Sequence, residues 1–181
     1  MSIKTKLKDF VYAALFAAII MVLGFISFPL PFSPVPVTGQ TLGIMLAGSI
    51  LTVRQVILSV STFLFLGIVG VPVFAGGTGG LGIIVGPRGG YLIGFLIGAV
   101  VIALLRGKKK NILRLGLANI VGGIGVIYIF GVLWLSYVTE LGLSKAFLVG
   151  ALPYIPGDLF KVFAATILAS RLQAQLKWQS S

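Results

Sequence analysis

Two oppositely charged residues, Asp158 and Lys161, lie within a strongly apolar part of the sequence. Pro156 and Gly157 precede them and helix-forming residues follow, so we expect Asp158 in the first turn of a helix, where a negative charge suits the positive end of the helix dipole. Lys161 lies one turn further along the same face. In a membrane-spanning helix this pair must face protein, water or a ligand, because exposure to lipid costs too much free energy. An inert salt bridge is the alternative to a binding role.

The carboxylate of Asp158 can accept hydrogen bonds from N–H donors, and Lys161 or Arg88 can supply a cation for a carboxylate. Aromatic residues around them could bury an apolar body, among them Tyr91, Phe160 and Phe163. The pattern predicts a small, partly apolar ligand that carries an amide-like N–H group and an acid.

The chain lacks the residues that most enzymatic mechanisms need. The chain has three acidic residues and neither histidine nor cysteine, so Cys/His metal sites, thiol nucleophiles and histidine bases are excluded. Asp9 and Glu140 sit at predicted membrane edges, which leaves Asp158 as the only acid expected to be buried. No Gly-Lys-Ser/Thr follows the glycine-rich segment 75–90, which argues against a phosphate-binding loop. We predict no catalytic residue, no metal site and no cofactor.

The composition is that of an integral membrane protein. Apolar residues make up 58% of the chain, charged residues make up 9%, and the mean hydropathy is +1.14, whereas soluble domains carry about 25% charged residues. The length of 181 residues allows five or six membrane helices and no separate soluble domain. The net charge of +11 does not indicate nucleic-acid binding, because the basic residues cluster at the ends of apolar runs.

We therefore predict an all-α fold, a single membrane domain over 1–181 with a bundle of six transmembrane helices. The helices are expected at about 10–28, 40–51, 55–70, 91–105, 115–138 and from 146 or 154 to 169. The proline-rich stretch 29–41 should be extended, and the glycine-rich stretch 71–90 should form a re-entrant or cavity-lining loop. Small residues predict close packing at Gly90, Gly94 and Gly98, and bends at Gly122, Gly123 and Gly125.

With six spans, most of the fourteen basic residues fall on one side of the membrane. By the positive-inside rule, both termini are then cytoplasmic. The proline-rich loop, the glycine-rich loop and the Pro-Gly-Asp break would meet at the outer face as re-entrant or capping loops around a ligand cavity. The basic residues on the inner side are Lys4, Lys6, Lys8, Arg54, Arg106, Lys108, Lys109, Lys110, Arg114, Arg171 and Lys177.

Four alanines of the first predicted helix form two overlapping small-xxx-small pairs, Ala13 with Ala17 and Ala14 with Ala18. They predict either ordinary packing against a helix of the same chain or a docking face for another membrane protein.

Four separated motifs resemble one known family. The segment VGPRGGYLIGF (85–95) is similar to the signature GPTGGYLxGF of the BioY biotin transporters, and LGIVGVPVFA (66–75), PGDLFK (156–161) and PVTGQT (36–41) are similar to that family as well. The chain departs from the family pattern at Arg88, where Thr is usual, and at Gly39, where Leu is common.

The resemblance implies the substrate-binding (S) component of an energy-coupling factor (ECF) transporter in the bacterial cytoplasmic membrane. Such components have six membrane helices, bind a vitamin from outside, and assemble with a transmembrane coupling protein and two ATP-binding subunits. The family's docking face for the coupling protein falls on Ala13 with Ala17 or on Ala14 with Ala18, and its late Asp and Lys fall on Asp158 and Lys161.

Biotin carries two ureido N–H donors, an apolar ring and chain, and a carboxylate. We hypothesise that Asp158 accepts a ureido N–H and that Lys161, with or without Arg88, faces the polar ends of the ligand. The other expected contacts are Tyr91, the backbone amides near Gly89 and Gly90, and Gln40 or Thr41. The alternatives are a stand-alone secondary transporter of biotin or a similar small carboxylate, an intramembrane enzyme, and a structural adaptor without a ligand.

Overall fold

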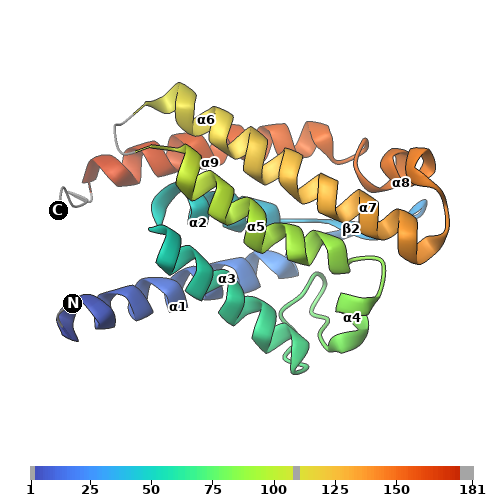
Figure 1. The fold of residues 1–181 in the computed structure, drawn as a ribbon, viewed down its shortest axis with the longest axis horizontal. Helices are drawn as coiled ribbons and strands as arrows, with labels where there is room; N and C mark the ends of the chain where they lie inside the picture. Colours follow the sequence, from blue (N-terminus) through green and yellow to red (C-terminus); the bar gives the residue numbers. More distant parts are fainter. Residues whose placement is uncertain (1–2, 108–110, 176–181) are drawn as a thin grey trace.

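The computed structural model describes residues 3–107 and 111–175 and is predominantly helical (Figure 1). Lys108, Lys109, Lys110 and Lys177, which contribute to the predicted orientation, lie outside the described residues. In chain order the elements are α1 (Ile3–Phe25), β1 (Ser27–Leu30), β2 (Ser33–Thr38), α2 (Gln40–Ile50), α3 (Val53–Ile68), α4 (Leu81–Val85), α5 (Gly89–Leu105), α6 (Ile112–Ile120), η1 (Val121–Val126), α7 (Ile127–Thr139), α8 (Leu143–Gly150) and α9 (Ile155–Gln175).

The long helices run roughly along one axis of the molecule (Figure 1). Helix α5 packs on α2, α3 and α7, while α1 packs on α2 and α3, and α9 packs on α2 and α6. The start of α1 and the end of α9 lie at one end of the bundle, and α4 and α8 lie at the other (Figure 1). This arrangement agrees with an even number of crossings. Which end faces the cytoplasm stays a prediction.

Within the described residues, two helical stretches are long and apolar enough to cross a membrane by themselves, Leu7–Phe25 and Ile112–Thr139. A third span results if Leu143–Gly150 and Ile155–Gln173, which meet at an angle of 55°, count as one. Helices α2, α3 and α5 are apolar but shorter. The 11 residues of α2 extend about 16 Å, against about 30 Å of bilayer hydrocarbon. The count of six membrane helices therefore stays a prediction.

The proline-rich stretch is extended, as predicted, but it forms a two-stranded antiparallel hairpin, so the all-α prediction needs correction. Strands β1 and β2 pair Ser27 with Thr38 and Phe28 with Val37, and the register shifts between Phe28 and Leu30. Proline fits such short strands because it lacks an amide hydrogen, and each strand has only one partner here. The sequence patterns show that the stretch is extended, whereas the pairing depends on how the chain folds back.

Small residues set the closest helix contact, between α5 and the α6–η1–α7 segment. A Cβ atom added at Gly94 would lie 2.9 Å from the Cα atom of Ile127, and one added at Gly122 would lie 2.5 Å from the carbonyl oxygen of Gly98. These distances confirm the close-packing stripe predicted from Gly90, Gly94 and Gly98. At Gly122, Gly123 and Gly125, where bends were expected, the chain forms the π-helical turn η1. Such turns widen a helix by one residue.

Candidate functional site

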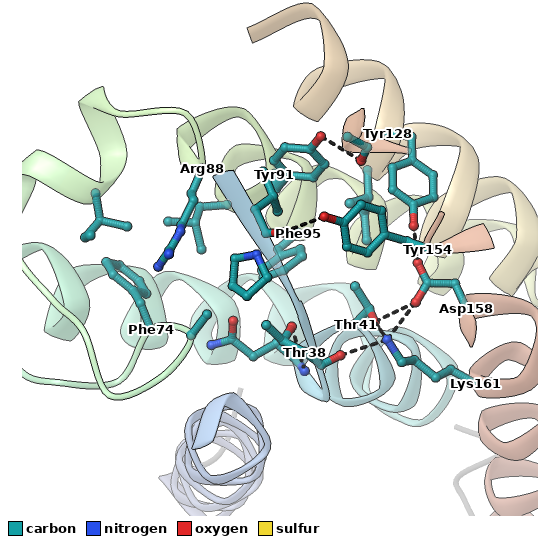
Figure 2. Close-up of a pocket in the computed structure, with 18 residues that line it drawn as sticks. Thr38, Thr41, Phe74, Arg88, Tyr91, Phe95, Tyr128, Tyr154, Asp158 and Lys161 are labelled. Carbon is teal, nitrogen blue, oxygen red and sulfur yellow. Dashed lines mark hydrogen bonds and ion pairs between the residues drawn. The ribbon is translucent and has the colours of Figure 1, made fainter. Parts of the chain in front are cut away.

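A pocket opens where the hairpin, the glycine-rich loop and the α8–α9 break converge (Figure 2). It contains about 580 Å³ of empty space, including the part that is open to solvent. The convergence of these irregular segments on one cavity confirms an expectation from the sequence. The lining residues are Val35, Pro36, Thr38, Gln40, Thr41, Phe74, Ala75, Ile83, Arg88, Tyr91, Leu92, Phe95, Ile127, Tyr128, Gly150, Tyr154, Asp158 and Lys161.

Asp158 lies at the centre of the hydrogen bonds on the polar side of the pocket. It lies in the first turn of α9, as predicted, and its side chain is 4% exposed. Its Oδ1 atom accepts hydrogen bonds from Lys161 Nζ (2.7 Å) and from Thr41 Oγ1 (3.2 Å), and its Oδ2 atom accepts one from the hydroxyl of Tyr128. A carboxylate has about four lone-pair positions. Three are occupied here, so Oδ2 retains one acceptor position.

Lys161 uses all three of its N–H donors within the protein. Besides Asp158, its Nζ atom donates to the carbonyl oxygen of Thr38 (2.7 Å) and to Oγ1 of Thr41 (2.9 Å). An ammonium has three donors, so Lys161 neutralises Asp158 and ties α9 to α2 and to the end of β2. It has no N–H group left for a ligand unless one of these bonds is released.

Three residues of the pocket wall form hydrogen bonds with the hairpin. Besides Lys161 at Thr38, the hydroxyl of Tyr154 contacts Oγ of Ser33 (2.8 Å) and the carbonyl oxygen of Val35. The Nε atom of Arg88 donates to the carbonyl oxygen of Pro34 over 3.4 Å, a long hydrogen bond. Strand β2 therefore forms one wall of the cavity.

Arg88 is the uncompensated charge of the pocket. It is half-buried, and burial lowers the pKa of its guanidinium from the ordinary value, although arginine remains charged at neutral pH. All three acidic residues lie in the described ranges, and none of them forms an ion pair with Arg88. With Asp158 and Lys161 paired, the described lining has a net charge of one positive unit. Figure 2 shows Arg88 on the side of the pocket opposite Asp158 and Lys161.

Apolar and aromatic side chains form the remainder of the lining. Phe74 of the glycine-rich loop is buried over Gly67 and makes an edge-to-face contact with Phe63 at 5.4 Å between ring centroids. The preceding residue is also fixed, because Gln40 Nε2 donates to the carbonyl oxygen of Val73 (3.1 Å). The loop therefore lines the cavity, as predicted for this stretch.

Six of the eight predicted ligand-binding residues line this pocket, namely Gln40, Thr41, Arg88, Tyr91, Asp158 and Lys161. Gly89 and Gly90 do not. Both are buried where α5 meets α4 and α7, and the amide of Gly89 donates to the carbonyl oxygen of Gly86. Phe160 and Phe163, expected around the ligand, are 73% and 64% exposed on the outside of α9.

Sequence reasoning missed several residues of the site, above all Tyr128, Tyr154 and Phe95. Tyr154 lies four positions before Asp158, and its hydroxyl group within an apolar segment was the available signal. Tyr128 lies thirty positions before Asp158, and no local pattern connects the two residues.

The four alanines of α1 separate into two pairs. Ala13 and Ala17 are buried, at 4% and 1% exposure, on the side of α1 that packs against its own chain. Ala14 and Ala18 are exposed. Only the second pair is available to another protein.

Comparison with known proteins identifies the fold family. The sequence profile of the BioY family matches residues 1–178. This chain belongs to the BioY family. It is 42% identical over 170 residues to the biotin transporter BioY of Rhizobium etli, covering 89% of this chain and 90% of the relative. It is 41% identical over 174 residues to the probable biotin transporter BioY of Bacillus subtilis, covering 94% and 93%.

A solved structure has the same fold. The crystal structure of the S-component for biotin from an ECF-type ABC transporter superposes with a TM-score of 0.89 at 33% identity, covering 96% of this chain and 95% of that one. Members of the BioY family are transporter components, so this chain is not an enzyme.

Proposed function

We propose that this chain binds biotin in the pocket beneath the β1–β2 hairpin and is the substrate-binding S component of an ECF-type vitamin transporter in the bacterial cytoplasmic membrane. The observation that carries the proposal is the free acceptor position on Asp158 Oδ2, within a largely apolar pocket of a BioY-family fold. A ureido N–H is a suitable donor for that position, and leaving a buried carboxylate without it would disfavour analogues that lack the N–H.

The other end of biotin fits the remaining charge. The valerate carboxylate needs a cation, and the three donors of Lys161 are already engaged. The guanidinium of Arg88 has five N–H groups and donates one hydrogen bond, to the carbonyl oxygen of Pro34, so its guanidinium fork is the better partner for a carboxylate. In this orientation the ureido ring lies against Asp158, the carboxylate points to Arg88, and the aromatic wall between them buries the apolar ring and chain.

Biotin binding to the purified protein in nanodiscs, measured by titration calorimetry, tests the site. Asp158→Asn keeps the shape of the side chain but replaces one acceptor oxygen with an N–H₂ donor, which opposes the ureido donor. We expect an affinity loss of about 30-fold or more. The control, Glu140→Gln, removes an exposed carboxylate from the α7–α8 turn and should bind like the wild type. Wild-type affinity in Asp158→Asn would end the assignment.

The proposed partners are a transmembrane coupling protein and two ATP-binding subunits. The likeness to a biotin S-component supports this assembly, and the exposed pair Ala14 and Ala18 on α1 offers a flat surface for a partner helix. Uptake of labelled biotin by cells that express this chain with and without a coupling module tests the proposal. Equal uptake in both would instead favour the stand-alone transporter.

A further inference from the structure

The outer surface of the β1–β2 hairpin is apolar although the hairpin closes a pocket. Phe28 is 64% exposed and Phe32 is 57% exposed, and three prolines beside them are exposed as well, namely Pro29, Pro31 and Pro34. The sequence has no charged residue between Asp9 and Arg54, so nothing on the hairpin is charged. A lid that faces bulk water would carry polar side chains on its outer surface.

The polar groups of β2 are directed to the protein instead. Its main-chain carbonyls at Pro34, Val35 and Thr38 accept hydrogen bonds from Arg88, Tyr154 and Lys161. The two surfaces of the hairpin therefore differ. Carbonyl groups on the inner surface bond to the pocket wall, and large apolar side chains lie exposed on the outer surface.

The exposed apolar surface continues from a membrane helix. Leu7–Phe25 is one of the two stretches able to span a bilayer, and its exposed side chains include Leu15, Val22 and Phe25. Ile26 is 52% exposed and leads into β1 at Ser27. The exposed apolar surface of α1 and the outer surface of the hairpin are therefore consecutive in the chain, without a charged residue between them.

We infer that the β1–β2 hairpin, with Phe32 at its turn and Phe28 near its base, inserts into the adjoining bilayer leaflet at the boundary of head groups and acyl chains. Burying the two aromatic rings there removes apolar surface from water. The two strands pair with each other, and three carbonyls of β2 accept hydrogen bonds from the pocket wall, which lowers the cost of approaching lipid. The hairpin over the ligand pocket would then contact lipid on its outer surface and Tyr154, Lys161 and Arg88 on its inner surface.

Spin-label accessibility in nanodiscs tests this inference directly, because the chain has no cysteine and each introduced one is unique. Phe32→Cys carries the reporting label. Leu15→Cys, on the exposed face of α1, is the lipid control, and Lys145→Cys, on the exposed start of α8, is the water control. Collisions with oxygen, which concentrates in lipid, are compared with collisions with a water-soluble nickel chelate.

We expect the label at position 32 to show the high oxygen and low chelate accessibility of position 15. Accessibility to the chelate equal to that of position 145 would overturn the inference, since the hairpin would then face water. Protection from both reagents would also overturn it, because another protein copy or a partner would then cover the tip. Phe28→Cys gives an independent reading if Phe32→Cys does not fold. The result does not depend on whether biotin binds, so it can fail separately from the proposed function.

Discussion

Lys161 in α9 donates a 2.7 Å hydrogen bond to the carbonyl oxygen of Thr38, the last residue of β2, while it pairs with Asp158 at the same distance. The residue that neutralises the buried acid also fastens the hairpin that covers the pocket. The neutralisation of Asp158 and the attachment of the hairpin over the pocket therefore depend on the same ammonium group.

Lys161→Met keeps the length of the side chain and removes its charge. The Asp158 carboxylate then remains buried without a cation, which should lower the free energy of unfolding by about 3 kcal/mol. Thermal unfolding in detergent, monitored by circular dichroism, measures the loss. The double variant Asp158→Asn/Lys161→Met should recover much of the stability but still bind biotin at least about 30-fold more weakly than the wild type. A Lys161→Met protein as stable as the wild type would show that the ion pair is dispensable.

Arg88→Met tests the orientation of the ligand. We expect its affinity for biotin to fall by about 30-fold while its affinity for biotinamide, which has no carboxylate, changes little. Titration of both ligands against wild type and variant gives the comparison. Equal weakening for both ligands would assign Arg88 only the role of holding Pro34. Asp158→Asn, in contrast, should weaken both ligands alike.

Gly98→Ala tests the close approach of α5 to the α6–η1 segment. The added methyl group would meet the carbonyl oxygen of Gly122 closer than 3.0 Å, and this overpacking should cost about 1–3 kcal/mol of stability. Gly116→Ala is the matched control, since its methyl group would lie 3.9 Å from Thr166. Alanine is the better helix former, so the control should gain up to about 1 kcal/mol. Similar unfolding temperatures for the two variants would contradict the packing role.

Ala14→Leu tests the proposed docking face. A larger side chain on the exposed surface of α1 should reduce co-purification with a coupling protein and leave biotin binding intact, because Ala14 is exposed and does not line the pocket. Ala17→Leu places the same side chain at a buried position and should instead lower the stability of the chain itself. Unchanged co-purification of Ala14→Leu would show that the coupling protein docks on another surface.

The sequence alone predicts the membrane class, the approximate bounds of most helices and the position of two charges at the start of α9. These follow from local properties: hydropathy, the conformational limits of proline and glycine, and the high cost of charge in an apolar segment. It also identified the α5 glycine stripe, because a period of about four residues places Gly90, Gly94 and Gly98 on one face.

Which of these groups meet depends on the fold of the whole chain. The hydrogen bonds of Asp158 to Tyr128 and Thr41 cross 30 and 117 positions of the chain, and no local pattern encodes such distances. The pairing of β1 with β2, the role of Gly89 and Gly90 in packing, and the division of the alanines into a buried and an exposed pair likewise depend on which helix lies opposite. The type of a residue limits the interactions that its side chain can form. The residues that the fold brings next to it determine which of these interactions occur.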